Sequence, residues 1–115
     1  MQKTTTLKKN YEFRRLYAKG RSAVMPTLVI YTRRSKGAGN RVGFTVTTKL
    51  GHAVVRNRVR RRLREIYRLH EDELCRGTDL VVVARGRSVS AAYRDLERDF
   101  LHACGKLALL REDTP

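Results

Sequence analysis

Alternating apolar and polar positions predict a strand over residues 41–47, where every second residue is apolar, at Val42, Phe44 and Val46. A period of two is typical of a strand with one buried face. The β-branched run 27–32 predicts a second strand, and the glycine-containing segment 37–40 predicts a turn between the two. We expect these strands to pair as an antiparallel hairpin.

Three other segments have the period of an α-helix. The first follows a candidate cap at Asn10, ends before Gly20 and has one aromatic face, formed by Phe13, Leu16 and Tyr17. The second, 53–70, has an apolar stripe at Val55, Val59, Leu63 and Ile66. The third follows a cap at Ser88 or Ser90, and its apolar positions are Tyr93, Leu96, Phe100, Ala103 and Leu107.

A continuous apolar run at 79–84 predicts a strand that is buried on both faces. The elements then follow the order α-β-β-α-β-α. Because a helix connects the second and third strands, we expect those two strands to be parallel within a mixed sheet. The sequence therefore predicts a single α/β (α+β) domain over residues 1–115, a two-layer sandwich with a βαβ crossover.

The charge of the chain indicates that this α/β domain binds a polyanion. The chain's 26 Lys and Arg residues and 11 Asp and Glu residues give a net charge of +15. Residues 1–64 hold 18 of the basic residues and one acid, Glu12, so this part of the chain carries essentially all of the net positive charge. Nucleic acid is the first candidate partner and an acidic membrane surface is the second.

The predicted helix 53–70 carries the densest charge. Seven of the thirteen residues 56–68 are Arg, and Glu65 is the only acid among them. At about 100° per residue, one face opposite the apolar stripe collects Asn57, Arg61, Arg64 and Arg68. Arg56 and Arg62 flank the stripe, and Arg58 and Arg60 lie at the sides. Such a helix can pack its valines on a sheet and present guanidinium groups to phosphates; a solvated face would usually mix Glu with Lys.

Residues for protein-based catalysis or metal binding are sparse. Phosphodiester hydrolysis by a protein needs convergent carboxylates or a placed acid and base, whereas the acids at 71–73 are consecutive. We interpret the three His residues as surface or packing residues, and Cys75 and Cys104 as thiols without a metal or disulfide. The sequence has no membrane span and no apolar signal segment, so we expect a cytoplasmic protein.

The segment 41–68 closely resembles the signature of the bacterial ribonuclease P protein subunit, which is centred on Arg56-Asn57-Arg58. The likeness includes Lys49, Gly51 and the Ala53-Val54 pair before that centre. It extends to Leu7-Lys8-Lys9-Asn10 and to the run 79–85. One departure is Thr48, where the family often has a second Lys.

This resemblance implies an auxiliary subunit of an endoribonuclease that removes the 5′ leader from precursor tRNA. The RNA subunit and its Mg²⁺ would perform the chemistry, so no catalytic residue, cofactor or metal is expected in the protein. No membrane or obligate protein partner is expected either. By the resemblance, the catalytic RNA would contact Lys49, Arg56, Asn57, Arg58, Arg60, Arg61, Arg62, Arg64 and Arg68. The single-stranded leader would contact Phe13, Tyr17, Tyr31, Arg60, Arg61 and Arg64. The family also implies a left-handed crossover, against the usual right-handed rule.

Some alternatives remain open at this point. A ribosomal-type structural RNA-binding protein would have a similar size and charge, and a protein nuclease is a third possibility. Phe13 could either attach the first helix to the sheet or stack on bases, while Tyr17 and Tyr31 fit a stacking platform better. We assign Phe44 and Phe100 to the core, and we expect Gly43 to admit the backbone of a ligand.

Overall fold

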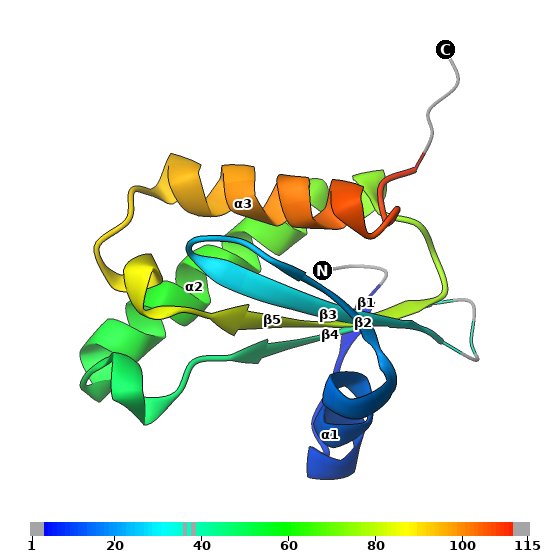
Figure 1. The fold of residues 1–115 in the computed structure, drawn as a ribbon, viewed down its shortest axis with the longest axis horizontal. Coiled ribbons are helices and arrows are strands. Elements are labelled where there is room, and N and C mark those ends of the chain that lie inside the picture. The colour runs from blue at the N-terminus through cyan, green and yellow to red at the C-terminus, as the bar shows by residue number, and fades with distance from the viewer. Residues whose placement is uncertain (1–3, 36, 38, 112–115) are drawn as a thin grey trace.

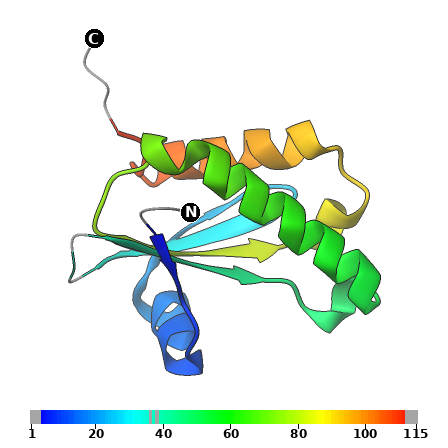
Figure 2. The ribbon, with the colours of Figure 1, turned by 180° about the vertical axis from the view of Figure 1, so that it is seen from behind.

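One sheet of five strands separates three helices into two unequal groups. The computed structural model describes residues 4–35, 37 and 39–111. Helices α2 (Ala53–His70) and α3 (Tyr93–Lys106) cover one face of the sheet, and α1 (Asn10–Lys19) crosses the other face, as Figures 1 and 2 show. The strands are β1 (Thr4–Thr6), β2 (Arg21–Val24), β3 (Leu28–Arg34), β4 (Asn40–Thr45) and β5 (Thr78–Ala84). The expected mixed α/β class is confirmed.

The central strand of the sheet is β5, and the strand order is β1-β4-β5-β3-β2. It pairs in parallel with β4 and antiparallel with β3. Its apolar run is buried on both sides, since Leu80 and Val82 join one core cluster and Val81 joins another. The parallel pair that α2 connects is therefore confirmed. The left-handed sense of this crossover stays a prediction.

The expected hairpin of β3 and β4 is wrong, because β5 lies between these two strands. The run with the most apolar residues takes the centre of the sheet, where both faces are covered. The true hairpin partner of β3 is β2, and the Met25 N–H closes their turn by donating to the Leu28 carbonyl at 2.8 Å. Between β3 and β4 the chain does reverse, although Ala38 of the expected turn lies outside the described residues.

Two short strands have no counterpart in the prediction. β1 consists of three threonines and pairs in parallel with β4, and β2 has the sequence RSAV. Neither has an apolar alternation long enough to be recognised. Short 3₁₀ turns at η1 (Thr48–Leu50), η2 (Glu71–Glu73) and η3 (Gly86–Val89) complete the fold.

The larger core cluster fills the space between the sheet and helices α2 and α3. The predicted stripe of α2 supplies Val59, Leu63 and Ile66, each at most 1% exposed, and α3 supplies Phe100. Helix α3 begins at Tyr93 after Ala92, so the prediction that Ser88 or Ser90 caps it is wrong. Both serines belong to the η3 turn or directly follow it.

Polar contacts attach α3 to its neighbours. Asp99, which is 2% exposed, accepts hydrogen bonds from the Thr27 N–H and hydroxyl at 3.0 and 2.7 Å. At the end of α2, His70 contacts Glu73 and lies 2.8 Å from a Glu97 carboxylate oxygen. Partial burial opposes protonation of His70, but these two carboxylates outweigh it and raise its pKa. Burial likewise raises the pKa of the Cys104 thiol to about 12.

The smaller core cluster attaches α1 to the opposite face of the sheet. It contains Leu7, Leu16 and Val81, with Phe13 and Tyr31 packed against them. Gly43 does not face a ligand as expected, because the Phe13 ring occupies that space. A Cβ at Gly43 would lie 2.6 Å from two Phe13 ring atoms. The missing side chain therefore lets α1 approach β4 closely.

The start of α1 also differs in detail from the prediction. Lys9 occupies the cap position and Asn10 is the first helical residue, so Asn10 is not the cap. The carboxylate of Glu12 accepts the Lys9 N–H at 3.3 Å. An acid in the first turn satisfies one of the free N–H groups there and is favourable toward the helix dipole.

Candidate nucleic-acid interface

Polar side chains that are exposed or half-exposed follow the side of α2 that faces away from the sheet. They border a shallow groove lined by Asn57, Arg60, Arg61, Arg64, Glu65 and Arg68. We call this set the arginine ridge. Among the described residues, Arg61 and Arg64 form no hydrogen bond or ion pair. Their charges are therefore available to an anionic partner.

Other arginines of α2 are engaged within the protein. Arg58 and Arg62 donate to the carbonyls of Val89 and Ala91 at 3.1 and 3.3 Å, which attaches the η3 region to the helix. Arg56 donates to the Gly51 carbonyl at 3.2 Å. Arg56, Arg58 and Arg62 therefore differ from Arg61 and Arg64 of the ridge, because they bond to backbone carbonyls of the protein.

At the far end of the ridge, Arg68 forms an ion pair with Glu65 at 2.5 Å. The hydrogen bond from Arg68 lowers the pKa of Glu65, so this carboxylate stays ionised. Arg68 therefore contributes less uncompensated charge than Arg61 or Arg64. Lys49, in η1, is exposed close to the start of α2.

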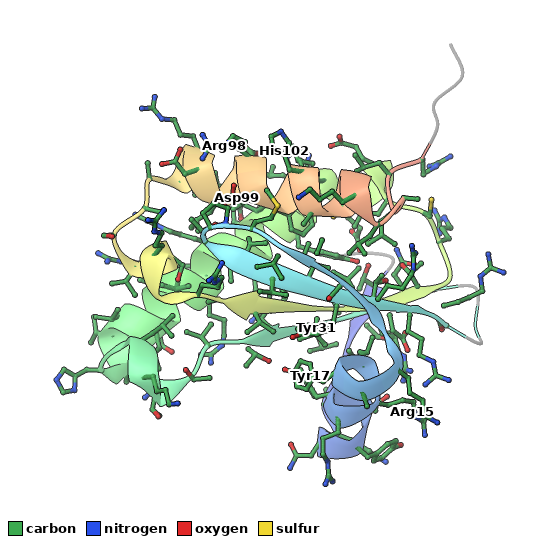
Figure 3. The ribbon with its side chains drawn as sticks, viewed as in Figure 1. Arg15, Tyr17, Tyr31, Arg98, Asp99 and His102 are labelled. Atoms are coloured by element: carbon green, nitrogen blue, oxygen red, sulfur yellow. The ribbon has the colours of Figure 1, made fainter. Side chains whose placement is uncertain are left out.

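A pocket with aromatic walls lies between α1 and the end of β4. We call it the aromatic pocket, and its lining residues are Asn10, Phe13, Arg14, Tyr17, Phe44, Thr45, Val46 and Arg60. Tyr17 is 39% exposed and its hydroxyl lies 2.8 Å from the Thr45 hydroxyl. The Tyr31 ring meets the Tyr17 ring edge-on, with centroids 5.0 Å apart, and Figure 3 shows the pair between α1 and the sheet.

The structure brings together only part of the set that the resemblance implies for the leader. Phe13, Tyr17 and Arg60 surround the aromatic pocket, and Tyr31 adjoins it through Tyr17. Arg61 and Arg64 do not line this pocket and belong to the ridge. Arg60 lines both features, so it joins the two surfaces.

Sequence reasoning missed several residues of the aromatic pocket. Arg14 lies one turn after Asn10, on the same side of α1 as Phe13 and Tyr17, and this helical spacing could have identified it. Phe44 packs against the larger core cluster as predicted, but its partly buried ring also forms a wall of the pocket. No sequence signal places Phe44 beside α1, because that contact joins distant segments.

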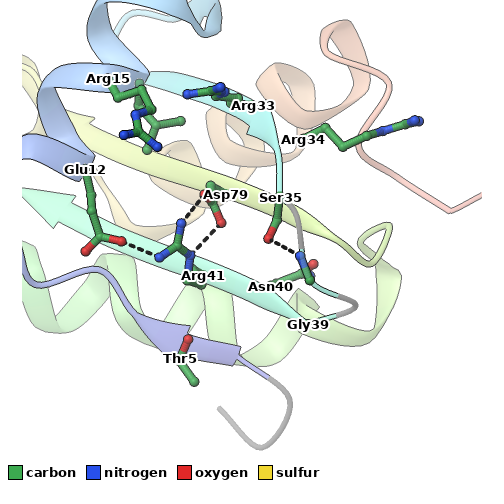
Figure 4. Close-up of a pocket in the computed structure, with 12 residues that line it drawn as sticks. Thr5, Glu12, Arg15, Arg33, Arg34, Ser35, Gly39, Asn40, Arg41 and Asp79 are labelled. Carbon is green, nitrogen blue, oxygen red and sulfur yellow. Dashed lines mark hydrogen bonds and ion pairs between the residues drawn. The ribbon is translucent and has the colours of Figure 1, made fainter.

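A second pocket lies on the other side of α1, and Figure 4 shows its interior. We call it the arginine pocket, with Glu12, Arg15, Arg33, Arg34, Arg41 and Asp79 among its lining residues. Arg41 donates from Nε and Nη2 to the two Asp79 oxygens at 2.9 and 2.6 Å, and from Nη1 to Glu12. The hydrogen bond to Asp79 is the largest cause that raises the pKa of Arg41. This triad ties α1 to β4 and β5.

The described ranges contain no group of three or more His, Cys, Asp or Glu side chains placed to hold a metal ion. None of the helices in those ranges is long and apolar enough to cross a membrane. The chemistry that the surfaces offer is instead stacking on exposed rings and ion pairing with phosphates. That combination suits single-stranded nucleic acid.

Comparison with known proteins decides the family. The model of the family Ribonuclease P matches residues 1–108. The chain belongs to the ribonuclease P protein family. It resembles the ribonuclease P protein component of Alkaliphilus metalliredigens, with 41% identity over 96% of this chain and 99% of the relative. The corresponding component of Natranaerobius thermophilus is 40% identical over 98% of both chains.

Solved structures of ribonuclease P proteins share the fold. The Staphylococcus aureus protein superposes with a TM-score of 0.84 at 30% identity, over 92% of this chain and 97% of that one. The Thermotoga maritima protein gives 0.77 at 25% identity, over 84% and 92%. The resemblance seen in the sequence is confirmed, and the chain is a component of an RNA-binding endoribonuclease complex of tRNA processing.

We expect Arg41→Ala to lower the free energy of unfolding by about 2 kcal/mol, because it leaves the mostly buried Asp79 carboxylate without its donor. Urea unfolding followed by circular dichroism measures this loss. Arg34→Ala removes an exposed arginine from the same pocket and should change stability by less than about 0.5 kcal/mol. Equal losses in both variants would contradict a specific role for the triad.

Proposed function

We propose that this chain is the auxiliary protein of ribonuclease P, and that it binds both the catalytic RNA and the 5′ leader of precursor tRNA. The observation that carries this proposal is the pairing of an arginine ridge with an aromatic pocket, joined by Arg60. The ridge contacts the catalytic RNA. The pocket holds unpaired leader nucleotides next to it.

The character of the ridge supports a folded RNA as its partner. Arg61 and Arg64 present forked guanidinium groups that match phosphate oxygens in two-point contacts. Because α2 buries its apolar stripe on the sheet, these groups are held on a fixed helix and not on a loop. Cations on a fixed helix bind an ordered array of phosphates more tightly than cations on a flexible loop do, because less conformational freedom is lost on binding.

The aromatic pocket suits a partner whose sequence varies. Stacking on a ring contributes about 1–3 kcal/mol per base and accepts every base. A subunit that serves many precursor tRNAs needs this tolerance. Tyr17 and Tyr31 supply the rings, while Arg60 and Arg14 supply charge at the rim. Phe13 contacts Gly43 and also lines the pocket, so it both supports α1 and forms a wall.

We place the cleavage chemistry on the RNA subunit with its bound Mg²⁺, and we assign the protein no catalytic residue. The carboxylates of Glu12 and Asp79 converge, yet both are bonded to Arg41 and serve as its structural partners. A protein nuclease would need such carboxylates to hold metal ions or move protons. The protein then acts by raising affinity for the substrate and by supporting the active form of the RNA.

Processing of precursor tRNA at low Mg²⁺ tests this function. The cognate catalytic RNA should cut slowly by itself and faster when this chain is added. The arginines of the protein would neutralise RNA phosphates that would otherwise need Mg²⁺ to neutralise them. The purified chain alone should not cut. No stimulation, or cleavage by the chain without RNA, would contradict the proposal.

Arg61→Ala combined with Arg64→Ala should weaken binding to the catalytic RNA and make it less dependent on salt. Each lost phosphate contact should reduce the slope of log K against log salt concentration by roughly one unit. Filter binding over a range of salt concentrations measures the slope. An unchanged slope would remove these two residues from the interface.

Tyr31→Ala should reduce the affinity of the holoenzyme for precursor tRNA by roughly 1 to 3 kcal/mol and leave that for mature tRNA unchanged, because only the precursor has a leader to stack. Tyr31→Phe keeps the ring and should behave as the wild type. Equal losses for the two RNAs would instead indicate a role in folding or in docking on the catalytic RNA.

A further inference from the structure

Helix α1 lies between the aromatic pocket and the arginine pocket, so one side of the sheet has two separate openings. The residues of β3, β5 and β4 that face α1 form cross-strand rows. Tyr31, Val81 and Gly43 form one row beneath α1. Arg33, Asp79 and Arg41 form the next row, two residues along each strand, and this row is the floor of the arginine pocket.

The charge in the arginine pocket is not balanced by the protein. Four arginines and two carboxylates line it, and both carboxylates are taken by Arg41. Within the described part of the chain, Arg15 and Arg33 have no carboxylate partner. In Figure 4 both lie over the Arg41 and Asp79 pair, whereas Arg34 extends away from them. The pocket therefore presents two uncompensated cations.

The outer surface of α1 connects the two pockets. Arg14 lines the aromatic pocket and Arg15, the next residue, lines the arginine pocket. One turn before them, Tyr11 is 51% exposed, and the Lys9 ammonium and the Arg15 guanidinium lie 5.9 and 5.8 Å from the centre of its ring. An exposed ring between two cations is typical of surfaces that bind single-stranded RNA. A base stacks on the ring, and the neighbouring phosphates form ion pairs with the cations.

We propose that the arginine pocket is a second subsite for single-stranded RNA, which binds phosphates of the 5′ leader beyond the segment held in the aromatic pocket. This inference rests on the proposed function, because it extends the same strand. From the aromatic pocket the leader crosses α1 over Tyr11 and reaches Arg15 and Arg33.

The leader fits this subsite better than the catalytic RNA does. The arginine ridge lies on α2, which covers the opposite face of the sheet from α1 (Figures 1 and 2). An RNA docked on that ridge would have to pass around the sheet to reach Arg33. The leader, in contrast, is already on the α1 side when it occupies the aromatic pocket. Continuity along α1 therefore favours the distal leader.

The test compares Arg15→Ala/Arg33→Ala with Arg94→Ala/Lys106→Ala in the reconstituted holoenzyme. The second pair is a matched control, since it removes two exposed cations from α3, on the opposite face of the sheet. Each is assayed for binding to precursor tRNA with a leader of about 4 or about 15 nucleotides, which spans the usual range of single-strand site sizes. Mature tRNA is the reference.

With the long leader, the Arg15/Arg33 variant should bind about tenfold more weakly. Each lost arginine–phosphate ion pair should reduce the affinity about threefold. Its salt slope should fall by about 1.4, the value for two phosphates of a single strand. With the short leader, it should match the wild type, as the control should with both. Equal losses with both leaders, or no loss with either, would overturn the second subsite.

Failure of the second subsite can be told apart from failure of the proposed function. If the wild-type holoenzyme binds precursor tRNA no more tightly than mature tRNA, the chain does not bind the leader at all, and both ideas fall. A second outcome is that the wild type prefers the precursor while the Arg15/Arg33 variant binds the long-leader precursor as tightly as the wild type does. In that case the protein contacts the leader only in the aromatic pocket, and the second subsite alone is wrong. Urea unfolding of the variant separates either outcome from a loss of fold.

Discussion

Burial of β5 on both faces is the constraint on which the rest of the structure depends. A strand with Leu80, Val81 and Val82 fully buried needs cover on both sides. Helices α2 and α3 cover one face and α1 covers the other, so the arginine ridge and most of the aromatic pocket lie on opposite sides of the sheet. Arg60, at the side of α2, brings them together at the end of β4. The two surfaces to which the proposed function assigns the catalytic RNA and the leader therefore meet at one residue of α2.

The arginines of this chain serve two physical purposes, and their partners distinguish them. Arg58 and Arg62 donate to backbone carbonyls, and Arg41 is held by Asp79 and Glu12. These side chains support the fold. Arg61 and Arg64 on the ridge lack such partners in the described ranges, and so do Arg15 and Arg33 in the arginine pocket. The net charge alone does not distinguish arginines that bond to other groups of the protein from arginines that have no such partner.

Local patterns in the sequence predicted the three helices and the three longer strands. They did not predict the contacts between segments that are far apart in the sequence. The apolar stripe of α2, the arginines opposite it and the buried run of β5 all follow from spacing along the chain. The strand order does not, because pairing of β3 with β5 joins residues 44 to 56 positions apart. For the same reason the sequence could not show that Phe13 fills the space above Gly43, or that Arg41 binds both Glu12 and Asp79. The short strands β1 and β2 carry too little pattern to be recognised.

The proposed function requires that the arginine ridge face the catalytic RNA while the aromatic pocket faces the leader. Site-directed crosslinking in the complex with catalytic RNA and precursor tRNA tests it most directly. A photoreactive group would be attached to Arg64→Cys or to Tyr17→Cys, in a Cys75→Ser background that removes the accessible native thiol. We predict that the group at position 64 labels the catalytic RNA and that the group at position 17 labels leader nucleotides. Labelling of the same RNA segment from both positions would contradict the account.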